Sequence, residues 1–228
     1  AETRRMRPEL AEVVSELSYD NRLHAHPTAS LREVRGFSEA GLFWHPVSHF
    51  GNSTSSIEEA SEVVGIVRRA LGGSLYEPGE RPRPMGQQDV IVVAAYNAQV
   101  ECLSEALAEA GLEEVRVGTV DKFQGQEAAV AIVSLAASSG DDVPRGLDFL
   151  LMRNRLNVAI SRAMVAAFLV HSPALLDDLP WTPEGVARLS AFAHLVGADR
   201  EEDPAADEAE AAVGGLVTTG AQGSAGAL

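Results

Sequence analysis

Two arginines at the end of a predicted helix are the residues of this chain whose types and spacing first suggest chemistry. Arg155, Ala159 and Arg162 occur at i, i+4 and i+7, which places them on one face of a helix. Guanidinium groups held together on a rigid element suit a phosphate, because each planar fork can donate two hydrogen bonds to it. Arginines on a surface helix also commonly pair with nearby carboxylates. The spacing therefore leaves two interpretations open, an anion site and a surface ion-pair helix.

Other polar residues gather where predicted strands end. The apolar run DVIVVAA (89–95) is followed by Tyr96 and Asn97, and the short strand 115–117 is followed by the polar segment 118–127. In open parallel sheets, ligands bind at the loops that follow the carboxyl ends of the strands. The amide, hydroxyl and carboxylate groups of these loops, with the two arginines, therefore predict a shared binding site at that edge of a sheet.

The elements that must position these residues alternate between strands and helices. Continuous apolar runs such as 89–95 are typical of strands buried on both faces of a parallel sheet. Such alternation predicts a doubly wound, mostly parallel α/β sheet. The expected helices are 8–17, 56–71, 96–110, 147–163 and 182–196, and the expected strands are 41–48, 89–95, 115–117, 128–137 and 165–170. Segment 18–40 has no such pattern and is predicted to be irregular, and segment 72–88, with four glycines and three prolines, is predicted to be a loop or an insertion.

Composition divides the chain of 228 residues into three regions. Residues 1–40 form an N-terminal helix and crossing segment, residues 41–198 form the α/β domain, and residues 199–228 form an acidic and then Gly/Ala-rich tail. Residues 199–210 alone contribute −6 to the formal net charge of −15, so the tail is predicted to be disordered. The acidic balance argues against the basic proteins that bind nucleic acid without regard to sequence.

The lysine and cysteine counts exclude two further kinds of protein, those with a P-loop and those with a disulfide framework. Of 18 basic residues, 17 are arginine and one is lysine, Lys122. A phosphate-binding P-loop ends in Gly-Lys-Ser/Thr, whereas Lys122 follows Asp121, so the chain has no Walker A sequence. The single cysteine, Cys102, excludes an intramolecular disulfide framework. No apolar stretch reaches the roughly 18 to 20 residues of a membrane span, and no signal peptide is recognisable, so we expect a cytoplasmic protein.

Histidine pairs are the remaining candidates for a site. His24 with His26, or His45 with His49, could suggest a metal, but no cysteine and no convincing set of acidic ligands accompanies them. We therefore predict no metal site.

Several segments resemble a known family. GTVDKFQGQE (118–127) resembles helicase motif V, RLNVAISRA (155–163) resembles motif VI and VVAAYNAQ (92–99) resembles motif IV. TRRMRP (3–8) resembles the segment usually written Gln-Tyr-Arg-Met-His-Pro, and SYDNRL (18–23) resembles the sequence that follows it. Order and spacing agree from about residue 3 to 171. The chain is thus similar to the C-terminal (second) RecA-like domain of superfamily 1B helicases, the group of the nonsense-mediated-decay helicase, senataxin and the Okazaki-processing helicase-nuclease.

The resemblance implies a role for each matching residue. Arg162 would be the arginine finger that reaches the γ-phosphate of ATP held by another RecA-like domain, and Arg5 would be a second cation on the same phosphates. Glu127 would bind the nucleotide ribose. The implied cofactor-binding residues are Arg4, Gln124, Gly125, Glu127 and Arg155, and the implied nucleic-acid-binding residues are Tyr96, Asn97, Thr119 and Asp121.

Two positions depart from the family pattern. Arg4 stands where the family usually has a tyrosine that stacks on the adenine, and Ala95 stands where it often has threonine. A guanidinium plane can also stack on a ring, so Arg4 is expected to replace the tyrosine in that role.

These features predict the C-terminal motor domain of an ATP-dependent helicase that moves along single-stranded DNA or RNA, with 5′ to 3′ polarity by resemblance. Its expected partners are ATP with Mg²⁺, the single strand, and an N-terminal RecA-like domain of the same parent protein, which in this group is often fused to a RecB-like nuclease. Because the chain begins at Ala1 and not at a methionine, we interpret it as a piece of a longer protein. Without Walker A, the isolated chain is expected to be inactive. The alternative is a non-catalytic helicase-like remnant that binds a partner or nucleic acid.

Overall fold

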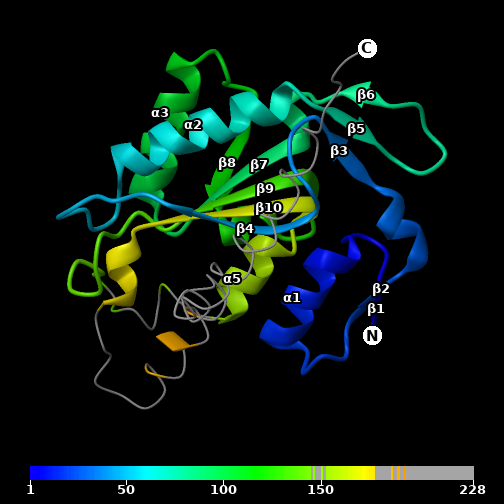
Figure 1. The fold of residues 1–228 in the computed structure, drawn as a ribbon. Coiled ribbons are helices and arrows are strands. Elements are labelled where there is room, and N and C mark those ends of the chain that lie inside the picture. Colours follow the sequence, from blue (N-terminus) through cyan, green and yellow to red (C-terminus); the bar gives the residue numbers. More distant parts are fainter. Residues whose placement is uncertain are drawn as a thin grey trace, which may run out of the picture.

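A five-stranded parallel sheet forms the centre of the computed structural model, which describes residues 1–144, 146, 150, 153–177, 186, 189, 190 and 193 (Figure 1). The strand order is β4-β10-β9-β7-β8, and every neighbouring pair is parallel. The strands are β4 (Gly41–Pro46), β7 (Val90–Ala94), β8 (Arg116–Thr119), β9 (Ala128–Ser134) and β10 (Ala163–His171). All five run the same way, so their carboxyl ends meet at one edge of the sheet, the carboxyl edge, and their amino ends meet at the opposite amino edge.

Helices cover both faces of this sheet (Figure 1). One face carries α2 (Ile57–Leu71) and α3 (Asn97–Glu109), and the other carries α1 (Pro8–Ser18) and α5 (Arg153–Ile160). Short 3₁₀ turns connect the elements: η1 (Pro27–Leu31), η2 (Gln87–Asp89), η3 (Val120–Phe123) and η4 (Pro173–Leu176). The predicted doubly wound, mostly parallel α/β class is confirmed.

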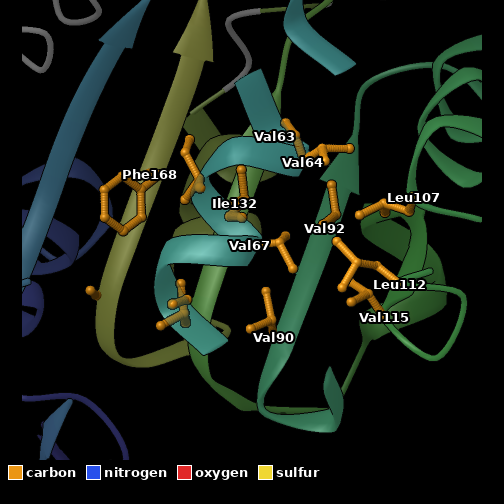
Figure 2. Close-up of a cluster of buried hydrophobic side chains, with 14 of the residues drawn as sticks. Val63, Val64, Val67, Val90, Val92, Leu107, Leu112, Val115, Ile132 and Phe168 are labelled. Atoms are coloured by element: carbon orange, nitrogen blue, oxygen red, sulfur yellow. The ribbon is translucent and has the colours of Figure 1, made fainter. Parts of the chain in front are cut away.

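Two hydrophobic cores explain the continuous apolar runs of the central strands. Ile91 and Val93 of β7 belong to the core under α1 and α5, whereas Val90 and Val92 belong to the core under α2 and α3. Figure 2 shows the second core, where Val67 of α2 lies near the β7 valines. Every residue of β7, β9 and β10 is buried, because neither face of these strands meets water.

Helix α2 begins as its sequence predicts. The Ser56 side-chain oxygen accepts a hydrogen bond of 3.1 Å from the Glu59 backbone N–H, which is an N-cap. Glu58 and Glu59 lie in the first turn, while Arg68 and Arg69 lie in the last, so both charge pairs complement the helix dipole.

Short strands occur in the two segments that we predicted to be irregular. β3 (Glu33–Arg35), β5 (Ser74–Tyr76) and β6 (Arg83–Pro84) form an antiparallel sheet, and β1 (Glu2–Thr3) pairs in parallel with β2 (His24–Ala25). Of the two predictions for 72–88, a loop is therefore wrong at Ser74–Tyr76 and Arg83–Pro84, where the chain forms strands. Strands of two or three residues show no alternating pattern, and the glycines and prolines around them suggested turns.

Two predicted boundaries also need correction. Helix α5 ends at Ile160, three residues before the predicted end, and Ala163 already belongs to β10. Strand β9 ends at Ser134, and Ala136 has a positive φ of 69°, a left-handed conformation that a regular strand does not contain. The predicted tail 199–228 lies outside the described residues, as does most of the predicted helix 182–196.

Candidate functional site

An open pocket at the amino edge of the sheet gathers arginines from separate parts of the chain. The pocket has a volume of about 570 Å³. Arg4 and Arg5 come from the N-terminal segment, Arg32 from the residue after η1, and Arg162 from the turn between α5 and β10. Glu127, the residue before β9, lines the same pocket. Converging guanidinium groups with one nearby carboxylate make this pocket suitable for a polyanion.

The N-terminal segment is held against the sheet by backbone hydrogen bonds. The Arg7 backbone N–H donates to the Met164 carbonyl of β10 at 3.0 Å, and Met6 is buried in the core under α1. The Arg32 Nη1 donates to the carbonyl oxygens of Arg4 and Arg5 at 2.7 and 2.6 Å. The backbone of Arg4 and Arg5 is therefore fixed on both sides, and their side chains reach into the pocket from a defined position.

Arg5 contacts Glu127 and Ser161, which lie in the segments that resemble motifs V and VI. Its Nε lies 2.5 Å from Glu127 Oε2, and its Nη1 donates to the Ser161 carbonyl at 3.5 Å. The Arg5 and Glu127 side chains are 33% and 48% exposed. An exposed ion pair of this kind is worth about 0 to 1 kcal/mol, so an entering anion can replace the carboxylate at low cost.

Arg162 is half-buried beside Arg5. Its Nε donates to the Val158 carbonyl at 2.9 Å, and its Nη1 lies 3.3 and 3.4 Å from the carbonyls of Phe123 and Gln126. Burial lowers the pKa of Arg162, and the positive charge of Arg5 lowers it further. Among the described residues its hydrogen-bond acceptors are all neutral, so the cation is oriented but its charge is not neutralised by a bonded carboxylate.

The turn between β8 and β9 presents Glu127 to this pocket. Gly125 has a φ of 80°, which favours glycine at this point of the turn. Arg116 of β8 donates from Nη1 to the Gln126 side chain at 3.0 Å and from Nη2 to the Glu127 carbonyl at 3.3 Å. Lys122 closes the other end of the turn, where its Nζ donates to the Val117 carbonyl at 2.7 Å.

The predicted pairing of Arg155 with Arg162 on one helix face is wrong. Helix α5 ends at Ile160, so Arg162 has left the helix and lies at the amino edge. Arg155 lines a different small pocket, with Ala95 and Val120 at the other end of the sheet. The helical spacing failed because the chain turns into β10 directly after Ile160. The guanidinium groups that share a pocket with Arg162 are those of Arg4, Arg5 and Arg32.

The implied nucleic-acid residues lie at the carboxyl edge. Tyr96 is the N-cap residue of α3 and Asn97 is its first residue, directly after β7. Thr119 is the last residue of β8, and Asp121 follows in η3. Asn97 and Asp121 are exposed, whereas Tyr96 and Thr119 are partly buried.

The residues predicted from the sequence thus separate into two groups. The prediction of one shared site at the carboxyl edge is wrong. Arg5, Glu127 and Arg162 meet at the amino edge, because Glu127 and Arg162 precede β9 and β10 instead of following a strand. Gln124 and Gly125 lie on the segment that runs between the two edges, and Arg4 is exposed at the rim of the arginine pocket.

Two residues that support the pocket could not be identified from the sequence. Arg32 supports the Arg4–Arg5 backbone, and Arg116 supports the Gln126–Glu127 turn. Both arginines bond to backbone carbonyls distant in the sequence, Arg32 also lies 3.7 Å from the Glu77 carboxylate, and Arg116 also bonds to the Gln126 side chain. Only Arg116 could have been suspected from the sequence, because it lies on strand β8, which leads into the motif V segment 118–127.

Within the described ranges, no helix is long and apolar enough to cross a membrane. The same residues contain no group of three or more His, Cys, Asp or Glu side chains arranged to hold a metal ion. His45 instead lies 2.9 Å from Glu62, and His49 is buried in a hydrogen-bonded network with Ser138 and Glu59.

Comparison with known proteins places the fold and the motifs in a family. The family model described as an AAA domain matches residues 2–173, which include all five strands of the central sheet. This chain belongs to the AAA domain family. Regulator of nonsense transcripts 1 of Caenorhabditis elegans is 30% identical over 190 residues, covering 75% of this chain and 17% of that relative. Mov-10-B.1 of Danio rerio is 29% identical over 195 residues, covering 75% of this chain and 19% of the relative.

A shorter alignment is closer in sequence. The DNA polymerase alpha-associated DNA helicase A of Schizosaccharomyces pombe is 48% identical over 75 residues, covering 33% of this chain and 11% of the relative. A structure titled as the C-terminal domain of a possible DNA helicase from Lactobacillus plantarum has a TM-score of 0.47 at 16% identity, covering 82% of this chain and 94% of that one. The family model and the three aligned relatives show that this AAA domain is a RecA-like domain of the superfamily 1B helicase type, and it spans less than a fifth of the length of each of these relatives.

Proposed function

We propose that this AAA domain is the C-terminal motor domain of an ATP-dependent superfamily 1B helicase. Arg162 and Arg5 act on the phosphates of ATP bound by a second RecA-like domain of the parent protein. The carboxyl edge forms one side of a channel for single-stranded DNA or RNA. The observation that carries the proposal is the arginine pocket, where Arg162 is oriented by neutral carbonyls and shares the pocket with Arg5.

Hydrolysis of ATP requires positive charge close to the γ-phosphate. Transfer of a phosphoryl group develops negative charge on the γ-phosphate oxygens, and a positioned guanidinium stabilises that charge. Arg162 has its orientation set before ATP arrives, while Arg5 leaves Glu127 and turns to the phosphates. The released Glu127 carboxylate then accepts a hydrogen bond from a ribose hydroxyl. Mg²⁺, held mainly by the second RecA-like domain and the ATP phosphates, would neutralise part of the phosphate charge.

One segment supports coupling between ATP and the single strand. Residues 120–127 leave the carboxyl edge after Thr119 and reach the amino edge at Glu127. A nucleic-acid contact at one end and a nucleotide contact at the other are therefore joined by a short turn that Arg116 and Lys122 stabilise. A shift of this turn on ATP binding is the proposed route to strand movement.

The decisive experiment compares Arg162→Ala and Arg162→Lys in the full-length protein. We expect kcat for strand-stimulated ATP hydrolysis to fall roughly 10³- to 10⁵-fold in the alanine variant, because the transition-state charge loses its guanidinium. Single-strand affinity, measured by fluorescence anisotropy, should stay within about twofold, since the strand contacts lie at the other edge. Arg35→Ala is the matched control, because Arg35 pairs with Glu33 on the surface and does not line the pocket. Turnover of Arg162→Ala within a few-fold of the wild type would contradict the proposal.

Two further measurements test the remaining parts. The isolated chain should hydrolyse no ATP, because its sole lysine follows Asp121 and no Walker A sequence is present. A strand-stimulated rate above background for this chain would refute that expectation. The proposed 5′ to 3′ direction predicts that the full-length protein displaces streptavidin from the 3′ end of a biotinylated strand and not from the 5′ end.

A further inference from the structure

Phe50 is an aromatic side chain that the fold leaves in solvent. It lies in the loop 47–55 after β4, at the carboxyl edge of the sheet, and it is 89% exposed. Neighbouring Gly51 has a φ of 72°, and an added Cβ there would meet nothing within 4 Å, so this part of the loop projects into open space. Single exposed apolar residues are common on protein surfaces. What distinguishes Phe50 is how firmly the residues around it are held.

Both neighbours of the Phe50–Gly51 pair are anchored in the protein. His49 is 3% exposed, and its Nδ1 lies 2.7 Å from the Ser138 hydroxyl. On the other side, the Asn52 backbone N–H donates to the same hydroxyl at 2.9 Å, and the Ser138 backbone N–H donates to the Asn52 carbonyl at 2.8 Å. The loop therefore holds Phe50 on a fixed base, so little conformational entropy is lost when the ring makes a contact.

The same network reaches the predicted nucleic-acid residues. The fully buried Glu59 carboxylate binds His49 at 3.1 Å and accepts from the Ser134 hydroxyl at 2.6 Å. Gln99 donates to that hydroxyl at 2.9 Å and accepts from the Ser56 backbone N–H at 2.7 Å. Gln99 lies in the first turn of α3, two positions after Asn97. The loops after β4, β9 and β7 are thus joined into one surface at the carboxyl edge.

We propose that Phe50 stacks on a base of the single strand and extends the nucleic-acid site from β8 and β7 to the far edge strand β4. This inference rests on the proposed function. The sheet order puts β8 and β4 at opposite sides, four strand intervals or roughly 19 Å apart. Thr119, Tyr96 with Asn97, and Phe50 follow three strands across that width. A single strand that crosses the carboxyl edge would meet all of them.

Local charge determines which part of the strand the loop can accept. Glu58 accepts hydrogen bonds from the Asn52 side chain and the Ser56 hydroxyl. The Asp142 carboxylate accepts from the Ser139 hydroxyl, and the Asp142 backbone carbonyl accepts from the Ser53 hydroxyl. Hydrogen bonds from the backbone and from Ser56 lower the pKa of Glu58, so this carboxylate stays ionised at neutral pH. Carboxylates repel phosphates but leave the uncharged face of a base free to stack on an aromatic ring. Phe50 therefore contacts a base while the backbone of the strand runs further from the loop.

The test measures binding of labelled oligothymidylate and oligouridylate to the full-length protein, in Phe50→Ala, Phe50→Leu and Phe50→Trp variants. Stacking predicts an affinity loss of roughly fivefold or more for alanine and leucine, and wild-type affinity for tryptophan. An otherwise identical strand with abasic sites should bind wild type and Phe50→Ala equally. Ile57→Ala is the matched control, because Ile57 is 79% exposed at the start of α2 but has no ring, and its affinity should not change. Phe50 is exposed, so all variants should keep the wild-type Tm.

The outcomes separate this inference from the proposed function. If Phe50→Leu binds as well as wild type, or if Phe50→Ala loses nothing on a strand with bases, the stacking role is overturned while the helicase proposal stands. If leucine preserves an interaction with a protein partner that alanine removes, Phe50 is a protein-docking residue instead. If the wild-type protein binds no single strand at all, the proposed function fails and the stacking role fails with it.

Discussion

Arg5 and Glu127 are 122 residues apart in the sequence, yet their side chains meet at 2.5 Å at the amino edge of the sheet. This pair joins the N-terminal segment to the turn before β9. Each residue is also a proposed nucleotide contact, so the two must separate when ATP binds. The pair therefore holds both side chains close to the pocket in which they are proposed to act. The Glu127 carboxylate also offsets the repulsion between the positive charges of Arg5 and Arg162.

The first prediction concerns the strength of this pair. Glu127→Gln should change the free energy of unfolding by less than about 1 kcal/mol, because the two side chains are a third and a half exposed. The KM for ATP of the full-length protein should nevertheless rise, since the amide is a weaker acceptor for a ribose hydroxyl than the carboxylate. Urea unfolding of the isolated chain and steady-state kinetics check the two parts. A loss of several kcal/mol would show that Glu127 has a structural role that the geometry does not explain.

The second prediction concerns Arg32, which donates to the carbonyls of both Arg4 and Arg5. Arg32→Ala should cost about 1 to 3 kcal/mol of stability, because two carbonyls lose a charged donor. Amide hydrogen exchange should become faster over residues 3–7 and stay unchanged in β7 and β9. Arg22→Ala is the control, since Arg22 pairs with Asp20 on the surface at 77% exposure. Unchanged exchange over residues 3–7 would exclude Arg32 as the support of that segment.

The sequence predicted the central sheet well because burial leaves a local signal. β7, β9 and β10 are buried on both faces, and such strands are readable as continuous apolar runs. The small antiparallel sheet was missed for the opposite reason. β6 is two residues long and ends at Pro84, and its place depends on Arg83 and Asp89, a contact that no local pattern encodes.

The arginine pocket also depends on tertiary contacts that no local sequence pattern encodes. Arg162 and Arg5 were named from the resemblance, but their meeting depends on where α5 stops and on the bond from Arg7 to Met164. Helical spacing paired Arg162 with Arg155, because spacing assumes that a helix continues. The supports Arg32 and Arg116 act through backbone carbonyls, so their roles became visible only with the tertiary structure.

The third prediction compares two glycines. The Lys122 side chain lies across Gly118 of β8, so a methyl group there would displace its flexible stem and weaken its bond to the Val117 carbonyl. At Gly73, a Cβ would lie 2.9 Å from the Arg35 carbonyl oxygen, which belongs to the backbone of β3 and cannot move freely. Gly118→Ala should therefore cost about 1 kcal/mol and Gly73→Ala clearly more, as judged by urea unfolding. Equal costs, or a larger cost at Gly118, would show that Lys122 is more rigidly placed than its side chain suggests.

The fourth prediction is a pH dependence of stability centred on Asp89. This carboxylate is 7% exposed and accepts a two-pronged interaction from Arg83, with N–O distances of 2.5 and 2.7 Å, and a third hydrogen bond from the Gly86 backbone N–H. Burial acts to raise the pKa of Asp89, but the hydrogen bonds from Arg83 and Gly86 outweigh it and hold the pKa below its ordinary value. A lowered pKa in the folded state means that the unfolded chain binds the proton more readily.

The sign of the effect follows from that difference. The contribution of Asp89 is fully present above the unfolded pKa of about 3.9 and is lost as the pH falls toward the lower folded value. Asp89→Asn should therefore lower the free energy of unfolding by about 1 to 3 kcal/mol at pH 7, with a smaller difference from wild type near pH 3. Asp20→Asn is the matched control, because Asp20 is 84% exposed in its side chain and pairs with the exposed Arg22. Urea unfolding of the isolated chain between pH 3 and 7 measures the difference. A gap between wild type and Asp89→Asn that stays constant over this range would show that the carboxylate stabilises β6 by shape and not by charge.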